Sequence, residues 1–276
     1  MSLSQNDWLR VLNPTVKANL GSVRHVLFDF DGTLSVLRQG WEPVMETVML
    51  EAICAGETSP QDLITEVRNY IDLSTGKLTI LQMQWLANKV VSTGLEKNPL
   101  SAAAYKKKYL QALMVSVSVR LESLENSTAR AEDYLVQGSQ EFVRGMAEKG
   151  TSLYIASGSD HDDVVREASA LGLVEYFQNG IYGALDASES NSKERVVQRI
   201  LDDHHLSGNE LLVVGDGPVE IIEGRQRGAI SLGVASDEVV HRGWNEHKVE
   251  RLTRAGADLL VADFTHSSEL IDLLIS

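Results

Sequence analysis

The chain has 276 residues, of which 43% are hydrophobic, and a formal net charge of −14. This length can bury one large core, or a core and a smaller domain. The negative charge argues against nucleic acid or an anionic membrane surface as a partner. No apolar stretch reaches membrane-spanning length, the N-terminus lacks a signal-peptide pattern, and the single cysteine, Cys54, excludes an internal disulfide. We therefore expect a cytoplasmic protein.

The first 20 residues are expected to form a short helical extension, with Pro14 and Gly21 as breaks. Residues 23–34 contain an apolar run of strand length that ends in two aspartates, Asp29 and Asp31, with Gly32 and Thr33 directly after them. Side chains alternate along a strand, so both carboxylates are expected to point the same way. Two neighbouring carboxylates repel each other, and this repulsion is costly unless a cation or a proton neutralises one of them.

A β-hairpin is the alternative for this stretch, because Asp-Gly is a common two-residue turn. A hairpin needs a second strand with period-two alternation directly after the turn. The following residues, Thr-Leu-Ser-Val-Leu-Arg-Gln-Gly-Trp-Glu-Pro, show no such pattern. The sequence therefore favours a strand that ends at a ligand site.

The region from about residue 42 to residue 137 is expected to be helical throughout. Ser59-Pro60 and Asn98-Pro99 are typical helix starts. Apolar residues recur at helical spacing, as in Ile64, Val67 and Ile71, and these stripes predict a helical core of their own.

From Glu141 onward, helices and strands alternate. We expect a helix to Lys149, a strand to Ala156 and a helix to Leu171, then a helix over 193–201 and strands over 210–214, 229–234 and 258–262. This alternation predicts an α/β fold with a doubly wound parallel sheet.

Three later stretches place further polar groups at strand or helix ends. Ser157 and Gly158 end one apolar run, and a hydroxyl with bare backbone amides can hold phosphate oxygens. Lys193 falls in the first turn of a helix, where the dipole disfavours a cation and a compensating anion is needed. Asp216, flanked by glycines and followed by Glu220, ends another run and suits a hard cation. Taken singly, each is also compatible with an ordinary turn, cap or surface residue.

Together the four stretches read Asp-x-Asp-Gly-Thr, Ser, Lys and Gly-Asp-x-x-x-Glu, in that order. This pattern resembles the haloacid dehalogenase-like hydrolase superfamily, in its phosphoglycolate-phosphatase-like branch. The resemblance covers residues 21–38 and 139–276 and implies a Rossmann-like core with a helical cap domain inserted over 39–138. Glu220 departs from the pattern, since many relatives have aspartate there.

The resemblance implies a Mg²⁺-dependent phosphatase that acts on a small phosphorylated metabolite, such as a sugar phosphate or phosphoglycolate, through an aspartyl-phosphate. Asp29 would be the nucleophile and Asp31 the general acid and base. Further implied roles are metal binding by Asp29, Asp31, Asp216 and Glu220, and phosphate binding by Thr33, Ser157, Gly158 and Lys193. A phosphomutase of the β-phosphoglucomutase type is the alternative, and a phosphorylatable signalling module is a weaker one.

The cap is expected to decide the substrate, because it is inserted directly after the first motif and can close over the site. The stretch 73–79 is its one prominent interior loop. Lys77, Thr79 and Gln82 are candidates to contact the leaving group, and Arg38 could meet a second anionic group. For each of them, a solvated surface residue is the alternative.

Overall fold

The computed structural model describes residues 7–185 and 192–275. Its strands are β1 (Leu9–Val11), β2 (His25–Phe28), β3 (Ser152–Asp160), β4 (Ile181–Ala184), β5 (Leu211–Gly215), β6 (Ile230–Val234) and β7 (Leu259–Val261). Its α-helices are α1 (Trp41–Ile53), α2 (Gln61–Ser74), α3 (Thr79–Thr93), α4 (Ala102–Glu125), α5 (Ser139–Glu148), α6 (His161–Ala170), α7 (Lys193–Asp203), α8 (Pro218–Gln226), α9 (Glu246–Ala255) and α10 (Ser267–Leu274).

The strands form one seven-stranded sheet in the order β1-β7-β6-β5-β2-β3-β4. All neighbouring pairs are parallel except β1 with β7. The order reverses beside β2, which lies between β5 and β3, so the ends of these three strands meet at the switch point where open α/β sheets bind ligands. The predicted doubly wound α/β fold is confirmed, and β2 is a central parallel strand, not half of a hairpin.

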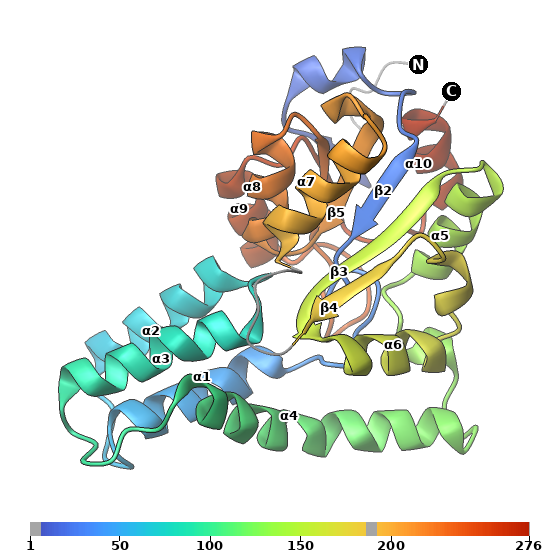
Figure 1. The fold of residues 1–276 in the computed structure, drawn as a ribbon. Coiled ribbons are helices and arrows are strands. Elements are labelled where there is room, and N and C mark those ends of the chain that lie inside the picture. Colours follow the sequence, from blue (N-terminus) through green and yellow to red (C-terminus); the bar gives the residue numbers. More distant parts are fainter. Residues whose placement is uncertain (1–6, 186–191, 276) are drawn as a thin grey trace.

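Helices cover both faces of the sheet, because the central strands are apolar on both sides. In β5, Leu211 and Val213 pack toward α7, whereas Leu212 and Val214 belong to the larger core on the opposite face. Figure 1 shows α7, α8 and α9 on one side of the sheet and α5 and α10 on the other. The central strands are therefore held rigidly, and so are the residues at their ends.

The prediction of a helical extension over residues 1–20 is wrong for much of that segment. Residues 9–11 form β1, which pairs with β7, and only Pro14–Ala18 is a short 3₁₀ helix. The side chain of Leu9 is buried against the sheet, and an unpaired edge of β7 would otherwise be open to solvent. Residues 1–6 lie outside the described residues. The sequence also missed β4, a strand of only four residues at the other edge.

The helices α1–α4 form an insertion between β2 and β3 and lie beyond the carboxyl ends of the strands (Figure 1). The helical stripe predicted from the sequence faces inward, since Val67 and Ile71 are buried and Ile64 is half-buried. Met83 and Val90 of α3 are buried as well. The rings of Tyr70 and Trp85 stack with centroids 3.8 Å apart. None of the helices within the described ranges combines the length and apolar character needed to cross a membrane.

The two chain segments that connect the inserted helices to the sheet are bonded to each other. The backbone N–H of Val36 donates to the carbonyl of Tyr134 at 2.8 Å, and that of Val136 donates to Leu34 at 3.0 Å. The hydroxyl of Ser139 donates to the same Leu34 carbonyl at 3.1 Å. This pairing fixes where the inserted helices leave and rejoin the core.

Gly138 lies at the rejoining point and has no room for a side chain. Its φ is +75°, and a Cβ would lie 2.3 Å from the carbonyl oxygen of Phe264. We predict that Gly138→Ala lowers the free energy of unfolding by about 2 kcal/mol or more, measured by urea denaturation. Gly56→Ala is the control, because Gly56 has φ +83° with nothing within 4 Å of its Cβ position. Equal losses in the two variants would contradict the steric argument.

Candidate active site

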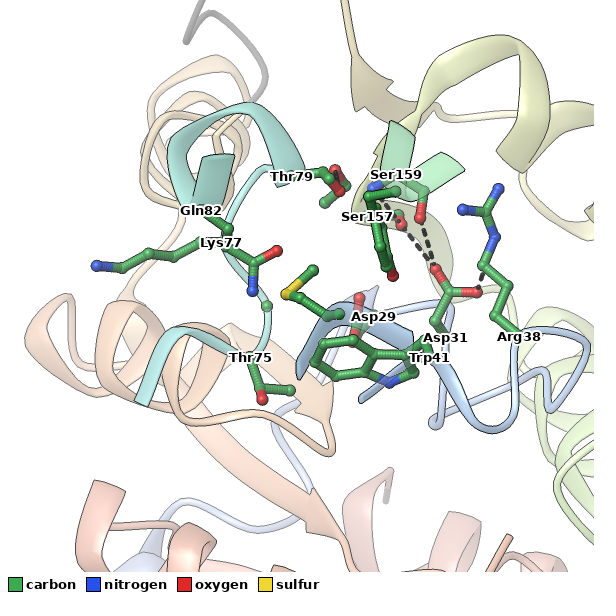
Figure 2. Close-up of a pocket in the computed structure, with 14 residues that line it drawn as sticks. Asp29, Asp31, Arg38, Trp41, Thr75, Lys77, Thr79, Gln82, Ser157 and Ser159 are labelled. Carbon is green, nitrogen blue, oxygen red and sulfur yellow. Dashed lines mark hydrogen bonds and ion pairs between the residues drawn. The ribbon is translucent and has the colours of Figure 1, made fainter. Parts of the chain in front are cut away.

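The two aspartates that end β2 face one cleft, together with two serines of β3 (Figure 2). Asp29 follows β2 directly, and its backbone N–H donates to Val214 of β5 at 2.8 Å, so the sheet itself fixes its position. The Oδ2 atom of Asp31 accepts from Ser159 at 2.9 Å and from Ser157 at 3.4 Å. The predicted common orientation of Asp29 and Asp31 is thus found, and the serines hold Asp31 by one carboxylate oxygen.

Lys193 lies between two carboxylates in the interior. Its Nζ is 2.8 Å from Oδ1 of Asp29 and 2.9 Å from Oε2 of Glu220. These are the compensating anions that a cation in the first turn of α7 requires. Burial lowers the pKa of Lys193, but the two carboxylates outweigh it and the net pKa is raised. Burial raises the pKa of Asp29, and the net pKa stays well above its usual value although Lys193 favours the charged carboxylate.

Glu220 connects Lys193 to the glycine-rich turn after β5. Its Oε1 accepts from the backbone N–H of Gly217 at 2.7 Å, while Oε2 accepts from Lys193. Both carboxylate oxygens therefore already have partners. Glu220 fixes the shape of the turn that carries Asp216.

Asp216 is held by two cations of α9 that sequence reasoning missed. Lys248 contacts its Oδ2 at 2.9 Å, and Arg251 lies 3.6 Å from the same atom. Burial alone would raise the pKa of Asp216, but Lys248 and Arg251 outweigh burial and lower it. A basic pair at i and i+3 is ordinary on a solvent-facing helix, so its spacing does not indicate that these two side chains are buried. Thr33 donates to the other oxygen, Oδ1, at 3.4 Å.

Asp29, Asp216 and Glu220 each offer a carboxylate oxygen within 4.8 Å of the others, and all three are buried. Three buried acids at this spacing favour a bound cation, since lysines neutralise them only in part. Asp29 keeps Oδ2 without a hydrogen bond among the described residues. The donor set thus fits a hard divalent metal held mainly by Asp29 and Asp216.

The loop between α2 and α3 lies directly across these strand ends. A Cβ on Gly158 would be 2.2 Å from the carbonyl oxygen of Lys77, and one on Gly217 would be 2.8 Å from that of Thr75. Both glycines therefore allow the loop to approach. Thr79 donates to the carbonyl of Gly158 at 3.2 Å. The loop singled out from the sequence is thus in contact with both the second and the fourth motif.

The four specificity candidates differ in what their side chains do. Gln82 lines the cleft, and its Nε2 donates to the Ser74 carbonyl at 3.3 Å, which supports the loop. Thr79 also borders the cleft, whereas the exposed side chain of Lys77 points away from it (Figure 2). The guanidinium of Arg38 contacts Glu167 of α6 at 2.7 Å, a partner that the sequence did not indicate.

Arg251 links the inserted helices to the turn that carries Asp216. Its Nη2 donates to the backbone carbonyl of Asp216 at 2.9 Å. Its Nη1 donates to Thr75 and to Glu42, each at 3.3 Å. The position of the inserted helices is thus tied to the position of Asp216.

The sequence profile of the haloacid dehalogenase-like hydrolases matches residues 23–228. The match covers well over half of the chain, and the chain belongs to this family of hydrolases. No protein with a curated description matches it.

Solved structures show the same fold at low sequence identity. A predicted phosphoglycolate phosphatase from Haemophilus somnus is 14% identical, with a TM-score of 0.60, over 90% of this chain and 98% of that one. A predicted phosphatase from Clostridium acetobutylicum is 16% identical, with a TM-score of 0.58, over 91% and 99%. A β-phosphoglucomutase from Clostridium difficile is 12% identical, with a TM-score of 0.56, over 91% and 99%.

Lys193 is the residue on which the charge balance of this site depends most directly. We predict that Lys193→Met lowers kcat for phosphate-ester hydrolysis at least about 10²-fold and the free energy of unfolding by roughly 3 kcal/mol. Without the lysine, Asp29 and Glu220 are left as buried carboxylates without a cation between them, which disfavours the charged form of Asp29. Steady-state kinetics and urea denaturation measure the two effects.

Lys89→Met is the matched control, because it breaks the surface pair of Lys89 with Glu66 at 2.7 Å. It should leave kcat unchanged and lower the free energy of unfolding by less than about 1 kcal/mol. Wild-type turnover by folded Lys193→Met would contradict the role of the lysine.

Proposed function

We propose that this hydrolase is a Mg²⁺-dependent phosphatase that acts on a small phosphorylated metabolite through a covalent phosphate on Asp29. The observation that carries the proposal is the pairing of Asp29 and Asp31 at one strand end, facing one cleft, with Lys193 on Asp29. Unaided phosphate monoester hydrolysis is extremely slow, so a route with two easier steps is favoured.

In the first step, a carboxylate oxygen of Asp29 attacks phosphorus and the bond to the ester oxygen breaks. Lys193 favours the ionised, nucleophilic form of Asp29 by binding its Oδ1. Asp31 gives a proton to the departing oxygen, so the leaving group departs as an alcohol. The two serines that hold Oδ2 of Asp31 fix its direction.

In the second step, water attacks the phosphorus of the aspartyl-phosphate. Asp31, now ionised, takes a proton from that water, and the bond between phosphorus and Asp29 breaks. Inorganic phosphate leaves and both aspartates return to their starting forms. One residue therefore serves as acid and then as base, which explains why two carboxylates at one strand end suffice.

The phosphoryl oxygens need hydrogen-bond donors whose bonds strengthen as negative charge develops on these oxygens. We assign this to Ser157, the backbone of Gly158, Thr33 and Lys193. Ser157 now donates to Asp31 and accepts from the N–H of Ser159 at 3.1 Å, so its hydroxyl would turn toward the phosphate on binding.

Asp29, Asp216 and the backbone carbonyl of Asp31 are the groups that we expect to hold Mg²⁺. Glu220 would act through the turn and Lys193, since both of its oxygens are occupied. When bound, Mg²⁺ offsets the repulsion between the carboxylates and the phosphoryl group. The helices α1–α4 serve as the cap, for which we propose the bounds 39–138, and Arg251 ties cap position to Asp216.

A phosphomutase would use the same two aspartates but return the phosphoryl group to a sugar. Release of inorganic phosphate separates the two reactions, because a mutase retains the phosphate on its product. The phosphatase is the simpler reading of the site, and no contact in the described residues favours the mutase over it.

The test of the proposed function is phosphate release from p-nitrophenyl phosphate by the wild type and by Asp29→Asn. The wild type should release inorganic phosphate with Mg²⁺ present. The variant should fold normally, as judged by circular dichroism, and lose more than about 10³-fold in kcat, since the amide is not a nucleophile. Near-normal turnover by a folded Asp29→Asn enzyme would overturn the assignment.

Metal removal is the second test. Activity should vanish with excess chelator, return with Mg²⁺ and be inhibited by Ca²⁺, whose looser coordination lets both oxygens of Asp29 bind and blocks attack. Calorimetry should also show that Asp216→Asn weakens Mg²⁺ binding at least about tenfold. Full activity in excess chelator would remove Asp216 from the metal site.

A further inference from the structure

The charge of the cleft bears on the chemistry of the leaving group. The lining of the cleft includes two cationic side chains, Arg38 and Lys77. Lys77 is exposed, and Figure 2 shows its side chain directed away from the cleft. The residues outside the described ranges contain no lysine or arginine in their sequence. Arg38 is therefore the one candidate among the lining residues to bind a second anion.

Arg38 is already neutralised by a buried carboxylate. Its Nη2 lies 2.7 Å from Oε1 of Glu167, and its Nε lies 3.1 Å from Oε2. Both side chains are buried, with 4% and 0% of their surface exposed. Burial raises the pKa of Glu167, but both of its oxygens accept from a guanidinium that does not lose its proton, and this contact favours the ionised carboxylate.

Two further carboxylates surround the same guanidinium. Oδ2 of Asp163 lies 3.4 Å from Nη2, and Oδ1 of Asp31 lies 3.7 Å from Nε. Even when Asp31 is protonated and therefore neutral, the carboxylates of Glu167 and Asp163 face the single positive charge of Arg38. A carboxylate or second phosphate on the leaving group would enter this negative surrounding without a free cation, which is costly.

The remaining lining is apolar or offers neutral hydrogen-bonding groups. Trp41 and Met45 of α1 and Tyr109 of α4 line the cleft, with Gln82 of α3 beside them. In the part of the chain that the structure describes, neither the Tyr109 hydroxyl nor Oε1 of Gln82 has a hydrogen-bond partner. Aromatic faces pack against C–H groups, and these polar atoms can bond to hydroxyls.

We infer that the leaving group is uncharged and hydroxylated, a small polyol or sugar, and does not carry a carboxylate or a second phosphate. The inference rests on the proposed phosphatase function and makes its substrate class narrower. Glu167 thereby becomes a specificity-determining residue, because it neutralises the cation that would otherwise accept an anionic leaving group.

Matched pairs of esters test this directly. Glycerol 3-phosphate and 3-phosphoglycerate share a three-carbon chain and differ by a CH₂OH in place of a carboxylate, and erythritol 4-phosphate and 4-phosphoerythronate differ likewise. We expect kcat/KM to favour the neutral ester at least tenfold in each pair. For an ester that is turned over too slowly, its Ki against p-nitrophenyl phosphate replaces kcat/KM.

Glu167→Gln tests the cause, because it keeps the shape of the side chain and frees the charge of Arg38. The preference for the neutral ester should fall at least fivefold, because the ester that carries a carboxylate binds better to the freed Arg38. Asp163→Asn is the second variant, should Glu167→Gln not fold, with a fall in the same direction. Glu223→Gln removes a carboxylate that pairs with Arg227 at 2.6 Å outside the cleft, and it should leave the preference unchanged. A merely structural defect would lower kcat/KM equally for both esters of a pair.

The outcomes separate the inference from the proposed function. Failure to hydrolyse any ester, p-nitrophenyl phosphate included, overturns the proposed function and the inference with it. Hydrolysis with less than a tenfold preference for the neutral esters overturns the inference alone. An unchanged preference in the folded Glu167 and Asp163 variants also overturns it, because the charge of Arg38 would then not set the preference.

Discussion

Neutralisation of buried carboxylates at one edge of the sheet is the constraint on which this structure depends. Asp29, Asp216 and Glu220 are all buried at the ends of β2 and β5, in a chain that is strongly acidic overall. Each would raise the pKa of the others if no cation were close. Lys193 neutralises one part of the cluster and Lys248 another. The charge of Asp29 therefore depends on Lys193 of α7 and that of Asp216 on Lys248 of α9, both far away in sequence.

The same cations tie separate parts of the fold together. Arg251 bonds to Thr75 of the inserted segment and to the carbonyl of Asp216, so the inserted helices and the turn that carries Asp216 share one side chain. Arg38 leaves the core beside Asp31 and is bound by Glu167 of α6. Removing such a cation would leave an uncompensated buried charge and would also loosen the contact between the inserted helices and the core. Stability and catalysis are thus expected to be lost together at these positions.

The sequence was sufficient for the parts of the site that lie at strand ends. Parallel strands bring their carboxyl ends to one edge, so apolar runs followed by Asp29, Ser157 and Asp216 could be placed together without coordinates. The need for an anion near Lys193 followed from the helix dipole alone. The contacts of the α2–α3 loop with Gly158 and Gly217 could not be predicted, because they depend on how the inserted helices dock.

Partners of buried charges were beyond sequence reasoning for a different reason. Lys248, Arg251 and Glu167 lie on helices where charged residues are ordinary, and only tertiary packing shows that these three are buried. The strand β1 was mistaken for helix because its three residues carry too little pattern, and pairing with β7 decides its conformation.

The central claim, attack of Asp29 on phosphorus with Asp31 as acid and base, is tested most directly by a rapid-quench burst experiment on Asp31→Asn. The p-nitrophenolate leaving group needs no proton, so the first step should proceed while the second, which needs a base, becomes slow. The account predicts a burst of one p-nitrophenolate per enzyme, with phosphate recovered on the Asp29 peptide by mass spectrometry. Turnover without a burst and without phosphate on Asp29 would contradict it.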